Sequence, residues 1–276
     1  MSRFPSCSLV ISTYNWPEAL EVCLLSILHQ TVLPQEVVIA DDGSREDTFK
    51  LIESYKSKFP VPIHHVWHPD NGFQVGKARN RAFAKSKYDY IVQIDGDVIL
   101  HPKFIYDHLN FAASGYFLSG SRMLMTPELS KKILKEKRTL ISLFEKGVNN
   151  KLNGIRFPIM SHILSPLYRV GEKKYYVKGC NMSFWRQDLI DVNGYDENFI
   201  GWGREDSDLA IRLMNNGKTK RFLKQRAVMC HIWHKVASRD YEKINITRMN
   251  EAIQNKLIWV DNGMDKYLNE LELHKI

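Results

Sequence analysis

The chain has 276 residues, of which 44% are hydrophobic, and it carries a formal net charge of +8. This length and apolar content suffice for one large domain, or for one domain with an appendage. Apolar runs of membrane-spanning length are absent, residues 1–5 lack a signal peptide's apolar region, and the four cysteines show no CxxC spacing. We therefore expect a cytoplasmic protein with reduced cysteines and an anionic partner, whose class the charge alone does not identify.

The first hundred residues alternate between strand and helix patterns. Pro17 and Glu18 are helix-start signals, and Pro60 ends a later helix. Strands are predicted over 8–12, 36–40, 63–67 and 90–94, and helices over 18–30, 48–59 and 76–86. This alternation indicates a parallel, doubly wound α/β sheet, in which ligands bind beyond the carboxyl ends of the strands.

Two carboxylates close the fourth predicted strand, in the sequence Asp95-Gly96-Asp97. Burial of an ionised carboxylate is costly unless the group is paired or binds a metal. A spacing of two places both side chains on one side of an extended backbone, and the glycine leaves room for a ligand. Such hard oxygen ligands suit Mg²⁺ or Mn²⁺, which usually also holds a phosphate. The alternative is an ordinary acidic turn at the end of a strand.

The pattern changes in the second half of the chain. Residues 131–138 form a basic helical stretch, with a solvated helix face and a membrane-surface patch as the two interpretations. The apolar residues 157–168 are interpreted as a mobile acceptor-side loop or a lipid contact. Residues 239–276 are expected to be helical, with a buried side made of Ile244, Ile246, Met249, Ile253, Leu257 and Ile258.

A second acidic cluster follows Gly201-Trp202-Gly203. The glycines provide flexible backbone around an aromatic surface on which a sugar ring can stack. Glu205, Asp206 and Asp208 then begin a helix, where the helix dipole alone would favour one or two acidic residues. Further on, His231 and His234 lie three residues apart. They would point in opposite directions on a strand, but in a loop both can face one ion.

Five segments together resemble the inverting glycosyltransferases of family 2, which have a GT-A-type fold. They are residues 10–15, 38–44, 76–80, 95–97 and 201–206, with the sequences VISTYN, VIADDGS, GKARN, DGD and GWGRED. The last segment resembles the C-terminal signature of β-1,4-galactosyltransferases and bacterial polysaccharide-chain transferases. The resemblance covers roughly residues 6–125 and 175–235 and leaves out the middle insertion and the tail.

The resemblance implies roles for residues on the nucleotide side. Ser12, Tyr14 and Asp42 would hold the base and ribose, with Tyr14 stacked on uracil and Asp42 accepting its N3–H. Asp41 is left to brace the turn. Arg79 would either meet the donor phosphates or orient the acidic pair. Trp202 would contribute the stacking surface for a sugar.

The resemblance also implies a metal site and a base. Asp97 would bind Mn²⁺ or Mg²⁺ directly, and Asp95 would contact ribose, the metal or its water. His234 would be the second protein ligand, with His231 as the substitute. Asp206 matches the position of the base that deprotonates the acceptor hydroxyl, and Glu205 would hold the acceptor or orient the site.

The expected fold is therefore a GT-A-type, Rossmann-like mixed sheet, mostly parallel and flanked by helices, with a helical C-terminal tail. The glycosyltransferase domain would span 1–238, with a nucleotide-sugar half at 1–125, an insertion at 126–174, an acceptor half at 175–238 and an extension at 239–276. The expected reaction moves a sugar from a UDP-sugar to a glycan or lipid-linked glycan in cell-surface polysaccharide or lipopolysaccharide synthesis, at or near the inner membrane face. A sugar-phosphate nucleotidyltransferase and a basic nucleic-acid-binding module are the alternatives, although residues 12–17 lack the former's glycine-rich loop and residues 131–138 lack the latter's interleaved aromatics.

Overall fold

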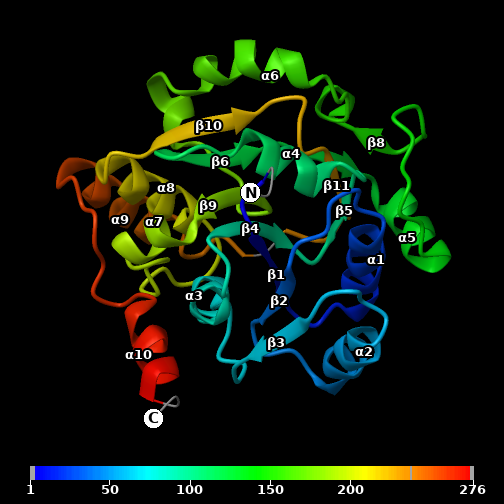
Figure 1. The fold of residues 1–276 in the computed structure, drawn as a ribbon, viewed down its shortest axis with the longest axis horizontal. Helices are drawn as coiled ribbons and strands as arrows, with labels where there is room; N and C mark the ends of the chain where they lie inside the picture. Colours follow the sequence, from blue (N-terminus) through cyan, green and yellow to red (C-terminus); the bar gives the residue numbers. More distant parts are fainter. Residues whose placement is uncertain (1–3, 237, 274–276) are drawn as a thin grey trace.

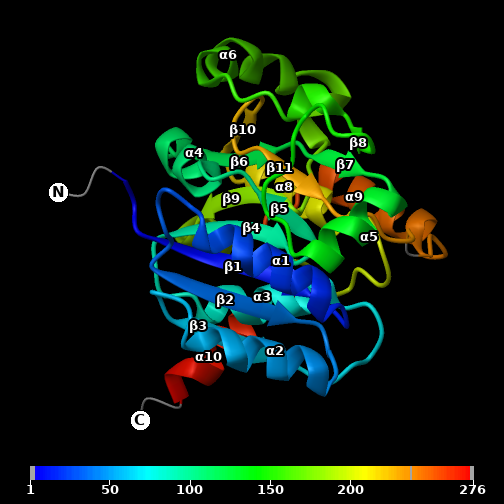
Figure 2. The ribbon, with the colours of Figure 1, turned by 90° about the vertical axis from the view of Figure 1, so that its right-hand side faces the viewer.

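The computed structural model describes residues 4–236 and 238–273. Its main sheet has seven strands in the order β10-β6-β9-β4-β1-β2-β3. Strand β9 runs antiparallel to β4 and β6, and the other pairings are parallel. The strands are β1 (Cys7–Thr13), β2 (Glu36–Asp41), β3 (Ile63–Trp67), β4 (Tyr90–Asp95), β6 (Tyr116–Gly120), β9 (Asn181–Trp185) and β10 (Thr219–Leu223). The expected mixed, mostly parallel α/β sheet is confirmed (Figures 1 and 2).

Helices cover both faces of this sheet. Leu9 and Ile11 of β1 face one core and Val10 faces the other, as expected for a strand buried on both sides. The first face carries α1 (Pro17–Leu28), α2 (Glu46–Lys56) and α4 (Phe104–Phe111). The second face carries α3 (Val75–Lys85), α7 (Arg186–Asp191), α8 (Glu205–Asn215) and α10 (Asp265–Leu273).

A second sheet of four short strands lies beside the first, in the order β5-β11-β7-β8. Its strands are β5 (Val98–Leu100), β7 (Met123–Met125), β8 (Val148–Asn149) and β11 (Met229–His231). Helix α5 (Pro127–Glu136) packs on it through Leu129 and Ile133, while Lys131 and Lys132 are exposed. The basic stretch is therefore the solvated face of an amphipathic helix.

The insertion and the tail differ from expectation. Residues 157–168 are not a loop: most of them form α6 (Pro158–Leu164) and the 3-10 turn η2 (Ser165–Tyr168), near the short turns η1 (Lys151–Asn153) and η3 (Gly171–Tyr175). The tail forms α9 (Glu242–Gln254) and α10, with residues 255–264 between them, and residues 274–276 lie outside the described part.

The expected buried side of the tail is wrong for three of its members. Ile244, Leu257 and Ile258 are exposed, and Asn245 and Ala252 are the residues that α9 buries. In the described ranges 4–236 and 238–273, every helix is too short or too polar to cross a bilayer. The division of the chain at residues 125, 174 and 238 stays a prediction.

Candidate active site

The carboxyl ends of β1 and β4 are joined by a close backbone approach at Gly96. The Gly96 N–H donates to the Ser12 carbonyl oxygen at 2.7 Å, and a Cβ at position 96 would lie 3.1 Å from that oxygen. A side chain here would press on the backbone of β1, which explains why the sequence between the two aspartates needs a glycine. Asp95 ends β4 and Asp97 lies in the turn that follows, so the two aspartates are not on one extended strand as expected.

Arg79 of α3 is buried between the two acidic segments that the sequence singled out. Its Nη2 donates to Asp95 Oδ1 at 2.9 Å, and its Nη1 donates to Asp206 Oδ1 at 2.9 Å. Its Nε donates to Ser12 Oγ, also at 2.9 Å. A planar guanidinium can bridge two carboxylates in this way, which an ammonium group cannot do in the same geometry. Arg79 was expected to meet the donor phosphates or to orient the pair Asp95 and Asp97, but of these two it contacts only Asp95, and its second carboxylate partner is Asp206.

Three donors fix the carboxylate of Asp206 at the start of α8. Oδ1 accepts from Arg79 and lies 2.8 Å from the Tyr195 hydroxyl, and Oδ2 accepts from the Gly179 N–H at 2.9 Å. Gly179 lies so close that a Cβ there would be 2.3 Å from Asp206 Oδ2. Asp206 therefore sits in one orientation, with Oδ2 carrying a single protein donor.

Asp97 lies with both histidines of the later segment. Its Oδ2 is 3.3 Å from His231 Nε2 and 3.2 Å from His234 Nε2, and one ligand atom from each residue lies within 4.8 Å of the others. His231 is paired with Val98 across the antiparallel β5–β11 ladder, which brings it beside the residue preceding Val98. Asp95, which was expected to share the metal, instead directs Oδ1 to Arg79.

This group of three has the chemistry of a divalent-metal site. Asp97 Oδ1 is buried and has no hydrogen-bond partner among the described residues, so a ligand position is available there. Burial lowers the pKa of His231 to about 4, which keeps its ring neutral and able to donate a lone pair near neutral pH. Burial opposes ionisation of Asp97, but the hydrogen bond from His234 and the nearby His231 outweigh it and lower the pKa of that carboxyl. The residues therefore fit a divalent cation with two nitrogen donors and one oxygen donor.

The residues expected to hold the nucleotide base have partners within the chain. The Tyr14 side chain is exposed, and its hydroxyl donates to Asp70 Oδ2 at 2.8 Å. Asp42 is buried, with Oδ2 accepting from the Gln74 N–H and Oδ1 lying 3.2 Å from His68 Nε2. A base would reach Asp42 only after the loop over residues 68–74 moved.

Asp41 braces its turn, as expected. Its Oδ1 accepts from the Ser44 N–H at 2.8 Å, and its Oδ2 lies 2.8 Å from His65 Nε2. Gly43 in this turn has a φ of +94°, and a Cβ there would lie 2.4 Å from the Asp70 Cα. The turn after β2 therefore packs directly on the loop over residues 68–74 that covers Asp42.

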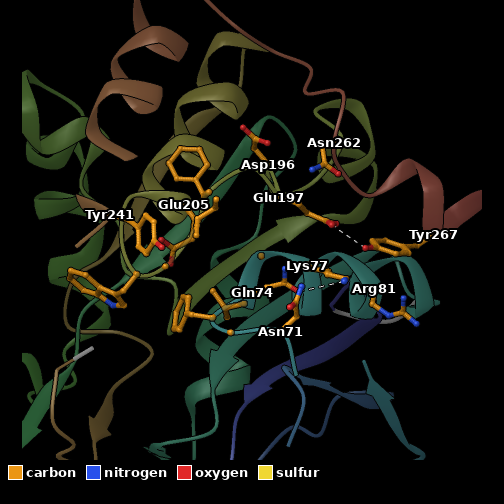
Figure 3. A pocket seen from close by; sticks show the side chains of 18 of the residues that line it. Asn71, Gln74, Lys77, Arg81, Asp196, Glu197, Glu205, Tyr241, Asn262 and Tyr267 are labelled. Atoms are coloured by element: carbon orange, nitrogen blue, oxygen red, sulfur yellow. Dashed lines mark hydrogen bonds between the residues drawn. The ribbon is translucent and has the colours of Figure 1, made fainter. Parts of the chain in front are cut away.

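A cleft of about 850 Å³ opens beside Glu205, the residue that precedes Asp206 in α8. Trp202 and Glu205 line it, together with residues from the loop before α3 and from the tail, which Figure 3 shows facing one another across the space. Burial, followed by the charge of Asp206, raises the pKa of Glu205 to about 7. The Glu205 side chain accepts from the Gly203 N–H at 3.1 Å, which ties this carboxyl to the glycine-rich loop.

Four residues of the site were not predicted from the sequence. Tyr195 and Gly179 touch Asp206, and Gln93 lies 3.0 Å from the Tyr195 hydroxyl and donates to the Gly179 carbonyl. The signal for Gln93 was an uncharged polar residue inside an otherwise apolar strand, which must find a buried partner. Tyr195 and Gly179 gave no comparable signal.

Arg122 is the fourth residue that was missed. Its Nη1 donates to Cys180 Sγ at 3.4 Å, and no carboxylate of the described residues lies within ion-pair distance of it. Its charge is nevertheless close enough to help hold down the pKa of Asp97, after the two histidines. An incompletely paired cation thus faces the metal group.

The chain matches two family models. The one described as "Glycosyl transferase family 2" matches residues 8–176, and the one described as "N-terminal domain of galactosyltransferase" matches residues 160–235. Relatives include a hyaluronan synthase of Pasteurella multocida, 28% identical over 76% of this chain and 23% of its own length. A chondroitin synthase of Escherichia coli is 26% identical over 76% of this chain and 32% of its own. The chain thus spans about a quarter to a third of the length of these relatives.

Solved structures share the fold. Residues 1–349 of S. aureus TarS give a TM-score of 0.62 at 16% identity, covering 97% of this chain and 70% of that one. The mannosyltransferase PcManGT from Pyrobaculum calidifontis, in complex with GDP-Man and Mn²⁺, gives 0.59 at 17% identity, covering 90% and 61%. At these identities the likeness shows the fold, which is of the GT-A type. The model described as "Glycosyl transferase family 2" matches more than half of the sequence, so the chain belongs to glycosyl transferase family 2.

Proposed function

We propose that this chain transfers a sugar from a nucleotide-sugar to an acceptor hydroxyl with inversion at the anomeric carbon. The observation that carries the proposal is the Asp206 carboxylate, which Arg79, Tyr195 and Gly179 hold in one orientation. The preceding residue, Glu205, lines an open cleft. The same guanidinium holds Asp95, which neighbours the Asp97 metal group. The proposed base is thus linked through Arg79 to Asp95, two residues from the proposed metal ligand Asp97, and this supports a displacement on an activated sugar.

In the proposed step Asp206 takes the proton of the acceptor hydroxyl. Its Oδ2 has one protein donor and its Oδ1 is contacted by two, so Oδ2 has the larger capacity left to accept a proton. The acceptor oxygen forms its bond to the anomeric carbon as the bond from that carbon to the phosphate oxygen breaks. The electron pair leaves with the nucleoside diphosphate. One base and direct displacement give inversion.

The metal group and Arg122 would serve the leaving diphosphate. A divalent cation bound by Asp97, His231 and His234 supplies Lewis-acid stabilisation of the charge that develops there. Two imidazole donors favour Mn²⁺ over Mg²⁺, which prefers oxygen ligands. Arg122 places a second positive charge beside this group. Asp95 would contact the ribose or the metal's water.

We infer a UDP-sugar as donor. Tyr14 offers an exposed ring on which a uracil can stack, beside the strand end that leads to the acidic pair. The solved complex of TarS with UDP supports this choice, although PcManGT binds GDP-Man. Asp42 would accept the uracil N3–H once the loop over residues 68–74 has opened.

The cleft is the proposed acceptor site. Trp202 would stack on a sugar ring, and Glu205 would hold an acceptor hydroxyl. We assign a glycan or lipid-linked glycan as the acceptor, and cell-surface polysaccharide or lipopolysaccharide synthesis on the cytoplasmic side as the setting, since relatives include polysaccharide synthases.

The test supplies a panel of UDP-sugars and GDP-sugars with Mn²⁺ and follows release of the nucleoside diphosphate. We expect one UDP-sugar to be turned over and Asp206→Asn to lower the rate by at least ~100-fold, because the base is lost. Asp191→Asn, at an exposed acid of α7, is the matched control and should keep the rate of the unaltered chain. Full activity in Asp206→Asn, or retention of the donor's anomeric configuration, would refute the scheme.

A further inference from the structure

Helix α6 of the insertion turns aliphatic side chains to solvent and serines to the protein. Helix α6 and turn η2 lie over β10 at the edge of the molecule (Figures 1 and 2). The positions that face the protein are serines, Ser161 and Ser165, which are 0% and 2% exposed. The positions that face solvent are aliphatic and recur at helical spacing: Ile159 (67% exposed), Ile163 (62%), Leu167 (58%) and, just beyond the turn, Val170 (66%).

Hydrogen bonds fix this orientation. The Ser161 hydroxyl donates to the Lys224 carbonyl, and the Ser165 hydroxyl accepts from the Phe222 N–H at 2.9 Å. Rotation of the helix to bury its aliphatic side would break both bonds and leave buried polar groups without partners. The apolar stripe is therefore held outward, and a contiguous exposed stripe of this kind marks a surface that contacts another apolar phase.

Positive charge concentrates in the segment of the chain that contains the stripe. Residues 146–178 contain seven Lys or Arg and one acidic residue, a net charge of +6 out of the chain's +8. Arg156 is neutralised by Asp107, but Lys146, Lys151 and Lys173 are exposed and have no carboxylate within ion-pair distance among the described residues. Lys173 Nζ lies 5.9 Å from the centre of the Tyr168 ring, and such exposed ammonium groups can meet an anionic partner.

Tyrosines complete the surface. Lys174 Nζ lies 4.5 Å from the centre of the Tyr175 ring, Lys178 Nζ lies 4.8 Å from that of Tyr176, and Tyr176 is half-exposed. Rings with one polar end and ammonium groups on long stems are the side chains that occupy the boundary between lipid headgroups and acyl chains. The aliphatic stripe supplies the part that would enter the acyl region.

We propose that α6, η2 and the lysines around them dock on the surface of an anionic lipid bilayer. Aliphatic side chains would insert between the headgroups while the lysines pair with lipid phosphates. Two copies of the chain joined through this face would set like charges against each other, which disfavours self-association there. The inference goes beyond glycosyl transfer and does not depend on it.

The test measures co-sedimentation of the full chain with vesicles of phosphatidylcholine alone or with about 30% phosphatidylglycerol. We expect binding to the anionic vesicles, loss of most of it between about 0.1 M and 1 M salt, and little binding to neutral ones. Ile159→Ser, Ile163→Ser and Leu167→Ser together should weaken it by ~10-fold or more. Lys173→Glu with Lys174→Glu should weaken it similarly.

Two matched controls lie on other faces. Ile244→Ser removes an aliphatic side chain of α9 that is 57% exposed, and Lys50→Glu reverses an exposed charge on α2. Both should bind as the unaltered chain does, and all variants should melt at about the same temperature, because the altered side chains other than the partly buried Lys174 are exposed. Equal binding by the triple serine variant overturns the proposal. So does absence of binding to anionic vesicles, or a dimer in sedimentation velocity that the serine variant abolishes. Each result is obtained without a sugar donor and leaves the proposed transfer reaction untouched.

Discussion

The raised pKa of Glu205 predicts that the free energy of unfolding of the chain depends on pH. Burial and the charge of Asp206 raise its pKa from 4.5 to about 7 in the folded chain. Between these two values the folded state binds a proton that the unfolded state has lost. The free energy of unfolding therefore falls as the pH rises through this window. Above pH 7 the cost of ionising the buried carboxyl is fully present.

The magnitude follows from the size of the shift. One pKa unit corresponds to about 1.4 kcal/mol, so the shift of Glu205 implies about 3 kcal/mol, of which about 2.5 kcal/mol develops between about pH 5 and pH 8. Glu205→Gln keeps an oxygen that can accept the Gly203 N–H and has no charge to bury. Its stability relative to the unaltered chain should thus increase by about 2.5 kcal/mol over that interval.

Urea unfolding of both chains at several pH values measures this difference, since effects of other titrating groups cancel between them. Glu46→Gln, at an exposed acid of α2, is the control for the removal of a carboxylate away from the site. The reasoning would be contradicted if the free energy of unfolding of Glu205→Gln, minus that of the unaltered chain, stayed constant within about 0.5 kcal/mol. It would also be contradicted if this difference decreased as the pH rises.

Three further substitutions test the geometry of the site. Arg79→Met leaves the carboxylates of Asp95 and Asp206 without their shared cation, and should cost about 3–5 kcal/mol in urea unfolding. Asp97→Asn weakens the oxygen donor of the metal group, and the rise in melting temperature that Mn²⁺ gives the unaltered chain should be largely lost. Gly179→Ala puts a methyl group onto Asp206 Oδ2 and should reduce turnover ~10-fold or more with a smaller loss of stability.

Each of these has an outcome that contradicts it. Unchanged stability in Arg79→Met would mean that the two carboxylates are not held by that charge. A full Mn²⁺ shift in Asp97→Asn would place the ion elsewhere. Turnover in Gly179→Ala equal to that of the unaltered chain would mean that Asp206 need not keep its orientation. Gly115→Ala, at a glycine with open space around it, controls for the mere addition of a methyl group, although its φ of +80° adds a strain of its own.

The order of strands and helices in the first hundred residues could be predicted because local signals agree there. Runs such as residues 37–40 are apolar throughout, and Pro17 marks a helix start that the structure places at the same residue. The strand at Tyr90 ends at Asp95, one residue beyond the prediction. These strands and helices lie within residues 8–176, which match the model of glycosyl transferase family 2, and this favours glycosyl transfer over the nucleotidyltransferase and the nucleic-acid-binding module.

Contacts between distant segments could not be predicted from spacing. His231 reaches Asp97 because β11 pairs with β5 in a second sheet, in a register that places His231 opposite Val98. Nothing in the local pattern near residue 231 indicates that partner strand. The resemblance supplied the pairing of aspartate and histidine, and the ladder gives its physical cause.

The tail shows how periodicity can mislead. Ile244 fits an apolar stripe but is exposed, whereas its neighbour Asn245 is buried. The Asn245 side-chain amide donates to the carbonyls of Ile200 and Gly203, at 3.1 Å and 2.9 Å, which enclose the loop that carries Trp202. A polar residue faces inward here because the loop has free carbonyls to satisfy. Hydrophobic periodicity cannot detect a helix that is held by such bonds.

The proposed base and the proposed metal group are positioned by different parts of the fold. Asp206 is held by Arg79 of α3 and by Gly179, two residues before β9, whereas the metal group depends on the β5–β11 ladder. Asp95 joins them, because it shares the guanidinium with Asp206 and is two residues from Asp97. Loss of the metal ligands should therefore leave the base in place, while loss of the guanidinium disturbs both. The affinity for Mn²⁺ measured in Arg79→Met tests this link. Arg79 has no hydrogen bond to Asp97, His231 or His234, so a weaker affinity would mean that the loss of Arg79 acts on the metal group through Asp95.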